Sequence, residues 1–379
     1  YMAAAACLGF VICLVIRNFP LQVFDRTISP SQQQDNTELL PQETPGDPGS
    51  LPLLDVAETG NEGMGFEEYI VHDIAELVNG NPWREEDDLS ALPVYQNQFL
   101  ENEPSSGANE DQMRECLLDI AGRLNLETNS LNINKNSIIA YDEDADYFSL
   151  SAQSKGLELE VDQSLTVDIG FDPAVSLPDS YHFSYSSSYG ELEKTADYLK
   201  EQYSDLIHMK RPQVDISGGG YDMYQWQSYE LAFYEAGEYM EENIVNYHFN
   251  RIVFYCDEEG KLFLARIFKP DLSQKIGSYP VITAEEATEL LCKGNYITSV
   301  PDAFPGKSHV AKRELVYRTG AEEKYFMPYY RFYVELPGTE EDGFKHYGAY
   351  YVPAVEQSYL ADMPSAQMGH GTEEPGMEK

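Results

Sequence analysis

The sequence predicts an α+β protein in which antiparallel β-meanders each follow a helix, placed after an N-terminal transmembrane helix and a disordered linker. Three observations carry this prediction. An uncharged apolar run covers residues 2–16, and a polar, proline-rich, acidic stretch follows it. From residue 112 onward, segments with helical spacing alternate with several strand-like segments that Gly and acidic turns separate.

The apolar run from Met2 to Ile16 indicates a membrane anchor within residues 1–18. Fifteen helical residues reach about 22 Å, short of the roughly 30 Å hydrocarbon core, and Tyr1 is not a native start, so we expect further residues upstream. A cleaved signal peptide needs a small-residue cleavage site, whereas the run ends in Arg-Asn-Phe-Pro. A lipoprotein anchored at Cys7 should continue into a polar tether, but residues 8–16 stay apolar. The pattern favours an anchor.

The charge of the chain limits its partners. It holds 65 acidic and 25 basic residues, a net charge of −40, and we therefore expect no binding to nucleic acid, which depends largely on neutralising phosphates. Residues 27–111 contain nineteen Asp or Glu and one basic residue, Arg84. We interpret residues 19–66 as a disordered acidic linker, because they lack the apolar surface that offsets ordering entropy. Residues 67–111 form a partly ordered docking segment, with a short helix expected over residues 66–78.

The first predicted α+β module covers residues 112–212. Its opening helix is predicted from apolar residues spaced three and four apart between Met113 and Leu124, and a second helix from the same pattern over residues 191–206. Between the two helices, short runs bounded by acidic and glycine turns are typical of strands. The expected strands are residues 137–141, 146–151, 157–161 and 165–171.

The second module covers residues 213–360, and a flexible tail is predicted for residues 361–379. Its helix begins at the capping box formed by Thr283 and Glu286, and Gly294 marks its end. The acidic turn 257–260 predicts a hairpin between two of the strands. The expected strands are residues 221–233, 247–256, 261–268, 311–319, 325–336 and 346–355.

Several stretches of the chain resemble uncharacterised single-pass membrane proteins of clostridial Gram-positive bacteria. These stretches are LPVYQNQF (92–99), NYHFNRIVFY (246–255), ITAEEATELLCKGNYITSVPDAFPG (282–306), ELVYRTGAEEKYFMPYYRFYVELP (314–337) and YGAYYVPAV (347–355). The resemblance implies a cell-membrane protein whose bulk is extracytoplasmic, although Arg17 and Arg26 by themselves favour the opposite orientation. The order of C-terminal elements is also similar to PepSY-like modules and to the YycI and YycH regulators of a sensor kinase, which implies regulation and protein contacts and transfers no catalytic residue.

Motifs for chemistry are incomplete, so the sequence predicts no catalytic residue, no metal site and no cofactor. The acidic run at 142–146 begins like a calcium loop, but Tyr147 replaces the required Gly and Gln153 the required Glu, which favours a solvated hairpin. The glycines 218–220 lack phosphate-loop spacing and indicate a flexible turn. His248 and His346 lie in strand patterns without a second ligand nearby. Carboxylate pairs of a glycosidase follow no sequence spacing, which leaves that chemistry open.

Tyrosine is the residue type that stands out, with 28 copies, many in predicted strands. Side chains alternate across a sheet, so the even-numbered residues 330–336 are predicted to face the core under the helix at 283–294. The opposite face is predicted to form an outward surface for a partner, of a composition typical of interface hot spots. This surface comprises Tyr329, Arg331, Tyr333, Glu335, Tyr347 and Tyr351. The competing interpretation is that another module packs on this face and buries it.

The function expected from these observations is that of a membrane-anchored binding or regulatory module and not an enzyme. Its partners would be the membrane, through the N-terminal helix, and a membrane sensor or another protein, peptide or envelope component. Two alternatives stay open. The first is a cell-envelope hydrolase, which a cleft with converging carboxylates of perturbed pKa would indicate. The second is a structural spacer for a membrane complex.

Overall fold

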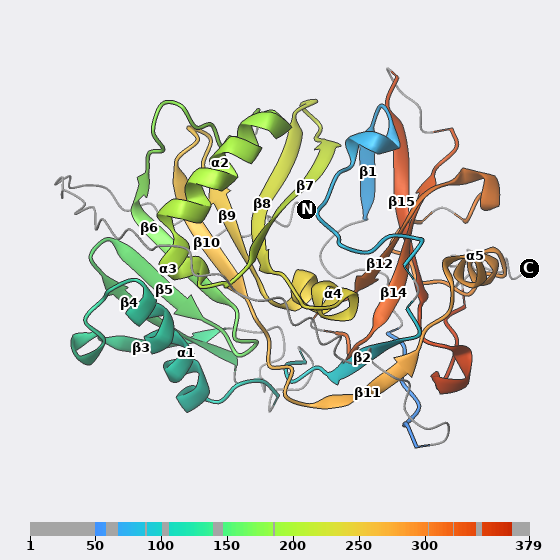
Figure 1. Ribbon diagram of the computed structural model, residues 1–379, viewed down its shortest axis with the longest axis horizontal. Helices are drawn as coiled ribbons and strands as arrows, with labels where there is room; N and C mark the ends of the chain where they lie inside the picture. The colour runs from blue at the N-terminus through green and yellow to red at the C-terminus, as the bar shows by residue number, and fades with distance from the viewer. Residues whose placement is uncertain are drawn as a thin grey trace, which may run out of the picture.

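The structure is a computed structural model that describes residues 50–57, 67–87, 89–100, 106–138, 147–184, 186–301, 303–320, 322–338 and 343–365. These residues form an α+β fold with three antiparallel sheets (Figure 1), as the sequence predicted. None of the helices in these ranges is long and apolar enough to cross a membrane. The predicted anchor, the acidic run at 142–146 and most of the predicted tail lie outside the described residues.

The largest sheet has eight strands in the order β3-β4-β5-β6-β10-β9-β8-β7. The strands are β3 (Ile133–Ile138), β4 (Tyr147–Ser154), β5 (Leu157–Val161), β6 (Val167–Val175), β7 (Pro212–Tyr221), β8 (Gln227–Glu235), β9 (Arg251–Cys256) and β10 (Leu262–Phe268). The predicted module boundary between residues 212 and 213 falls inside this sheet. Because β6 pairs with β10, and one apolar core joins residues 108–265, the chain does not divide at that boundary.

Three helices pack against one face of the eight-stranded sheet (Figure 1): α1 (Glu110–Arg123), α2 (Tyr189–Gln202) and α3 (Ser204–Ile207). Helix α1 begins at a capping box between Asn109 and Gln112. Alternation along the strands directs the apolar side chains towards these helices and leaves mostly polar residues on the other face. Ser149, Glu160 and Asp168 belong to that polar face, on three neighbouring strands.

The remaining sheets lie on the other side of the molecule. The four-stranded sheet has the order β1-β15-β14-β12 and the three-stranded sheet the order β11-β2-β13. Their strands are β1 (Glu68–Val71), β2 (Ala91–Gln96), β11 (Lys275–Pro280), β12 (Val310–Tyr317), β13 (Tyr325–Phe326), β14 (Pro328–Glu335) and β15 (Lys345–Pro353). Helix α5 (Ala284–Cys292) packs on the four-stranded sheet. Helix α4 (Met240–Phe249) lies between the two halves of the molecule, one with the eight-stranded sheet and the other with the two smaller sheets (Figure 1). Short 3₁₀ turns occur at η1 (Ile74–Glu76), η2 (Thr128–Ser130), η3 (Lys307–His309) and η4 (Gln357–Tyr359).

The capping signals of α5 are confirmed. The Thr283 hydroxyl accepts from the Glu286 N–H at 3.2 Å, and the Glu286 carboxylate accepts from the Thr283 N–H at 2.8 Å. Gly294 follows the helix with φ of +85°, a left-handed conformation that favours glycine. The helix buries its apolar side against Phe332 and Val352 of the sheet, as strand parity predicted.

Two elements differ from the prediction in type. Residues 68–76, expected within a short helix, form β1 and the 3₁₀ turn η1, because β1 completes the four-stranded sheet beside β15. Residues 247–249, expected in a strand, form the last turn of α4, in which Ile244, Val245 and Phe249 enter the core at helical spacing. Tertiary packing decided both cases.

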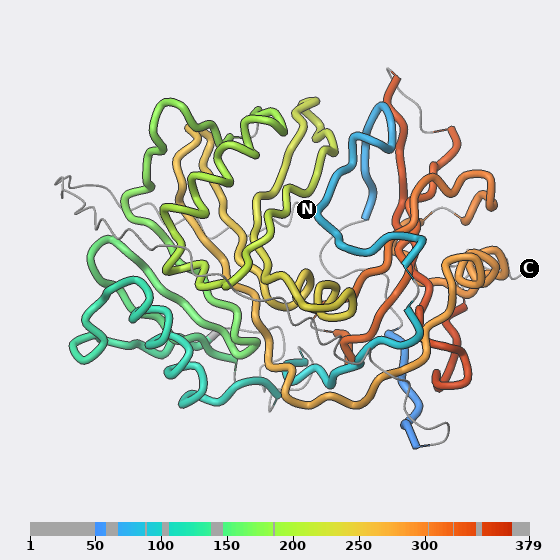
Figure 2. The backbone as a smooth tube through the Cα atoms, in the orientation of Figure 1, coloured from blue at the N-terminus to red at the C-terminus, as the bar shows by residue number. Residues whose placement is uncertain are grey.

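The predicted linker 19–66 includes a short segment that is packed. Leu54 is fully buried, its N–H donates to the Tyr359 carbonyl at 2.8 Å, and the Tyr279 hydroxyl donates to the Pro52 carbonyl. Figure 2 shows this segment, in blue, close to the red C-terminal turn. Residues 50–57 therefore belong to the fold, because Leu54 enters the same core as Tyr279.

The three glycines 218–220 lie within β7 and not in a flexible turn. Gly218 and Gly219 have φ of +128° and +104°. A Cβ on Gly219 would stand 2.0 Å from the Glu76 carbonyl oxygen, and Val78 exchanges backbone hydrogen bonds with Gly218. The glycines therefore allow the N-terminal segment to pack directly on β7, where the two halves of the molecule meet.

Candidate functional site

The predicted outward tyrosine surface is buried. Strand parity is confirmed, but Tyr329, Tyr333, Tyr347 and Tyr351 are only 0–4% exposed. Tyr333 and Tyr347 pack against Val71, the last residue of β1, and against Leu77, which follows η1 in the chain. The prediction of an exposed face is therefore wrong, and the competing interpretation of a buried junction holds. The sequence could not reveal this covering segment, because its interaction with β15 joins residues almost 280 positions apart.

The buried face carries a network of ion pairs centred on Glu314. The carboxylate of Glu314 contacts Arg331 Nη2 at 2.6 Å and Lys312 Nζ at 2.8 Å, and it accepts from the Tyr333 hydroxyl at 3.0 Å. Burial alone would raise the pKa of Glu314, but Arg331 and Lys312 outweigh it and lower the pKa to about 2. Tyr351 donates to Glu67 at 2.7 Å. These residues all belong to the four-stranded sheet, apart from Glu67, which directly precedes β1.

The remaining residue of the predicted surface, Glu335, lies nearer to solvent than the tyrosines. Its side chain is 29% exposed and contacts Lys345 Nζ at 3.1 Å, while the Tyr347 hydroxyl donates to it at 3.5 Å. The six predicted residues therefore lie together on one side of the four-stranded sheet, where the four tyrosines are buried and Glu335 lies at the edge.

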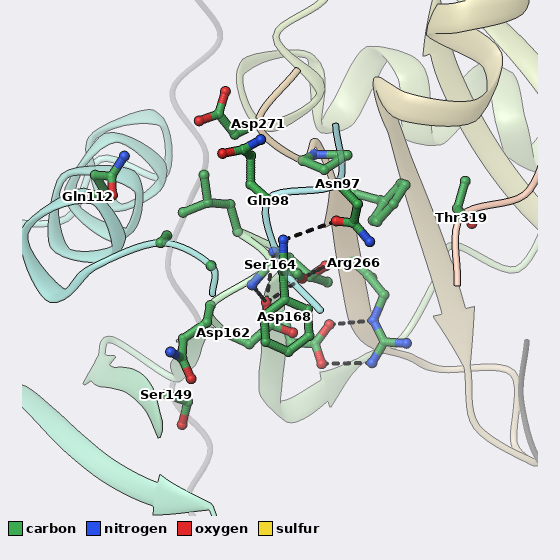
Figure 3. Close-up of a pocket in the computed structure, with 18 of the residues that line it drawn as sticks. Asn97, Gln98, Gln112, Ser149, Asp162, Ser164, Asp168, Arg266, Asp271 and Thr319 are labelled. Atoms are coloured by element: carbon green, nitrogen blue, oxygen red, sulfur yellow. Dashed lines mark hydrogen bonds and ion pairs between the residues drawn. The ribbon is translucent and has the colours of Figure 1, made fainter. Parts of the chain in front are cut away.

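A cavity of about 870 Å³ lies at the end of the polar face of the eight-stranded sheet. The β5–β6 turn and the start of α1 form one side (Figure 3). Residues that follow β2, β10 and β12 close the other side. Its lining mixes carboxylates, amides and aromatic rings. The lining side chains include Asn97, Gln98, Gln112, Ser149, Glu160, Asp162, Asp168, Arg266, Asp271 and Phe326.

The carboxylates of this cavity are held in fixed positions. Asp162 Oδ1 accepts from the Ser164 N–H at 2.9 Å, the Ser164 hydroxyl at 2.5 Å and the Thr166 N–H at 3.1 Å. Burial raises the pKa of Asp162, and these hydrogen bonds act against the rise. Asp168 binds Arg266 through two parallel bonds of 2.7 and 2.8 Å, which Figure 3 shows as a fork. The charge of Arg266 is therefore already matched.

Amide groups add donors and acceptors to the same cavity. Asn97 accepts from the Phe99 N–H at 3.0 Å and donates to the Glu323 carbonyl at 2.9 Å, which fixes its orientation. Gln112 belongs to the capping box of α1. Sequence reasoning missed this site. The alternation of polar residues in β4, β5 and β6 was its one local signal, and that pattern also describes an ordinary solvent face.

The histidines singled out in the sequence occupy different settings. His248 lies in α4, contrary to the predicted strand, and His346 lies in β15 with its Nδ1 hydrogen-bonded to Glu68. Among the described residues, no group of three or more His, Cys, Asp or Glu side chains is arranged to hold a metal ion. The acidic run considered for calcium lies outside those residues.

Comparison of the chain with models of known protein families, and with curated protein sequences, gives no match.

Proposed function

We propose that this protein is a membrane-anchored, extracytoplasmic binding or regulatory module that takes a cationic, hydrogen-bonding ligand, a basic peptide or protein segment, into the 870 Å³ cavity. The charge of the lining carries this proposal. Among the described lining residues, four carboxylates (Glu160, Asp162, Asp168 and Asp271) face one cation, Arg266, which Asp168 already neutralises. Such a cavity attracts positive charge and repels anions.

The mixed lining supports recognition of a polar chain. Amide side chains such as Asn97, Gln98 and Gln112 can pair with peptide N–H and C=O groups, while Phe99, Phe268 and Phe326 offer apolar contact. The volume lies within the range of typical ligand pockets, about 300–1,000 Å³. The anchor predicted at residues 1–18 would hold this cavity at the outer membrane surface, and the acidic linker would keep it away from anionic lipid.

Binding is favoured over hydrolysis because three of the four carboxylates are engaged by other groups of the protein. A glycosidase needs one protonated acid and one carboxylate free to reach the substrate. Asp162 accepts three hydrogen bonds from its own turn, Asp168 is occupied by Arg266, and Glu160 accepts from the Ser149 hydroxyl at 2.5 Å. A purely structural spacer, the other alternative, has no use for a cavity of this charge.

The test measures binding of two fluorescein-labelled peptides of equal length, one rich in lysine and one rich in glutamate, to the full chain by fluorescence anisotropy. The lysine peptide alone should bind, and binding should weaken with added salt. The double variant Glu160→Gln/Asp271→Asn should weaken it roughly three- to tenfold, the scale of two partly exposed charge pairs.

The control is Glu158→Gln, which removes a charge from the same strand and the same sheet face but outside the cavity lining. It should leave the affinity unchanged. Equal weakening by both variants would show only a general attraction to an acidic protein, and would refute the cavity as the site.

For the topology, the linker should be open to an added protease in intact cells; protection there would contradict the extracytoplasmic orientation.

A further inference from the structure

A second cavity, of about 340 Å³, lies between the halves of the molecule and differs in charge from the first. Its lining includes three arginines from separate segments: Arg251 in β9, Arg318 after β12 and Arg331 in β14. None of the described residues that line it is Asp or Glu. In a chain of net charge −40, such a gathering of cations around one space is unexpected from composition.

The arginines are oriented by carboxylates that do not line the cavity. Arg331 uses Nε and Nη2 for Glu314, and its Nη1 lies 3.7 Å from Glu67. Arg251 bonds Asp215 and Glu230 through Nη2. A guanidinium group carries five N–H donors, and Nε and Nη1 of Arg251 make no hydrogen bond to any other described residue. Fixed guanidinium groups with donors to spare are suited to a planar or tetrahedral oxyanion.

His248 is an independent observation at the same cavity. It lines the cavity from α4, and its Nε2 atom is buried without a hydrogen-bond partner among the described residues. Burial, together with Arg251 and Arg331, lowers the pKa of His248 to about 3. The imidazole is therefore neutral at pH 7 and can donate one hydrogen bond to a ligand. The two arginines lower the pKa in the same direction as burial, and Glu314 acts against them.

The remaining walls are tyrosine rings and small polar groups. Tyr333 and Tyr351 come from the four-stranded sheet, Tyr247 from α4, and Ser217 from β7. The volume is at the lower end of ligand pockets, which excludes a long chain and fits a small molecule.

We propose that this cavity binds the oxyanion group of a small organic molecule, a carboxylate or a phosphate, between the guanidinium groups of Arg251 and Arg331 and the imidazole of His248. Thr319 is the one described residue that lines both this cavity and the acidic one, and the proposal does not depend on the function proposed for the acidic cavity. Because its walls come from both halves, an anion bound there would link the two.

The experiment follows the melting temperature of the full chain in detergent with inorganic phosphate, with succinate, and with sodium chloride at matched ionic strength. Selective binding to the folded state stabilises it, and at a hundredfold excess over Kd the rise should be about 5 °C. A rise with phosphate alone or with succinate alone identifies which oxyanion the cavity takes. No rise beyond sodium chloride with either ion would overturn the proposal.

Two matched variants locate the site. Ser217→Asp places a negative charge on the cavity wall, whereas Ser228→Asp makes the same change at an exposed position of the neighbouring strand that does not line the cavity. The first should abolish the ligand-induced rise and the second should keep it. A rise that survives in Ser217→Asp would place the anion elsewhere and refute the site.

A readout on the unaltered chain guards against a misfolded variant. The imidazole resonances of His248, assigned by their loss in His248→Phe, should shift on adding the stabilising anion and not on adding sodium chloride. If the melting temperature rises while these resonances stay unchanged, the anion binds outside this cavity and the proposal fails.

Discussion

Replacing Glu314 by Gln should remove both stability and part of its pH dependence. Glu314 is 4% exposed and holds Arg331, Lys312 and Tyr333 at the junction of the two halves. Glu314→Gln leaves Arg331 with Glu67 as its remaining ion-pair partner. Breaking a buried pair by removing one partner typically costs about 3–5 kcal/mol, because the other charge stays buried. We expect a loss of that size in the free energy of unfolding at pH 7.

The pH dependence follows from the pKa of Glu314. It is lowered to about 2 in the folded protein, against about 4.3 in an unfolded chain. The folded state therefore holds fewer protons, so the contribution to stability, about 3 kcal/mol in full, is present above the unfolded pKa and is lost as the pH falls towards the folded one. Between pH 7 and about pH 3.5 the loss amounts to about 1 kcal/mol.

The assay is urea unfolding of wild type, Glu314→Gln and a control, Glu335→Gln, at both pH values. The difference between wild type and Glu314→Gln should narrow by about 1 kcal/mol at the lower pH, since the variant lacks the titrating group. Glu335 has a more exposed pair with Lys345, so its variant should lose less than about 1 kcal/mol. A Glu314→Gln loss no larger than that of the control, or a difference that stays constant with pH, would refute the reasoning.

Two further substitutions test how the N-terminal segment joins the fold, each by urea unfolding. Leu54→Ala should lower the free energy of unfolding by about 2–5 kcal/mol, the range for buried leucines. Leu53 is 57% exposed, so Leu53→Ala should change the free energy of unfolding little. Equal effects of the two substitutions would mean that this segment is not packed. Gly219→Ala should be destabilised more than Gly306→Ala, because both have positive φ but only at Gly219 would the Cβ meet the Glu76 carbonyl, at 2.0 Å. Equal losses of stability would show that the positive φ alone, and not the contact with Glu76, determines the cost of adding a Cβ.

The local signals in the sequence predicted local structure well. The capping box at Thr283 and the glycine at 294 define α5, and alternation along residues 329–336 assigns each side chain of β14 to its observed face. These features depend on residues a few positions apart, where propensity and periodicity act directly. The packing of the segment 50–57 does not follow from its sequence, because its three leucines, beside one proline and one aspartate, show neither helical nor strand spacing, although Leu54 enters a core.

Contacts between distant parts of the chain were beyond such signals. Strand β1 pairs with β15, and β6 pairs with β10 although three helices and three strands lie between them in the chain, so neither the sheet order nor the module boundary follows from neighbouring residues. The acidic cavity shows the same limit. Ser149, Glu160 and Asp168 read as a solvent face, and they line a cavity only because Asn97 and Thr319 close over them.

The tyrosine face shows what parity can and cannot decide. Parity identifies which residues share a face, but the segment that covers the face comes from elsewhere in the chain. The aromatic and arginine side chains predicted to face a partner therefore lie on a covered face of the sheet. Arg331, Tyr333 and Tyr351, three of the six residues predicted for an outward surface, line the small cavity between the halves. A cation buried among tyrosines retains its need for a negative partner. Glu314 and Glu67 supply that partner for Arg331. The Nε and Nη1 atoms of Arg251 make no hydrogen bond to another described residue, so their partner has to come from solvent or from a ligand.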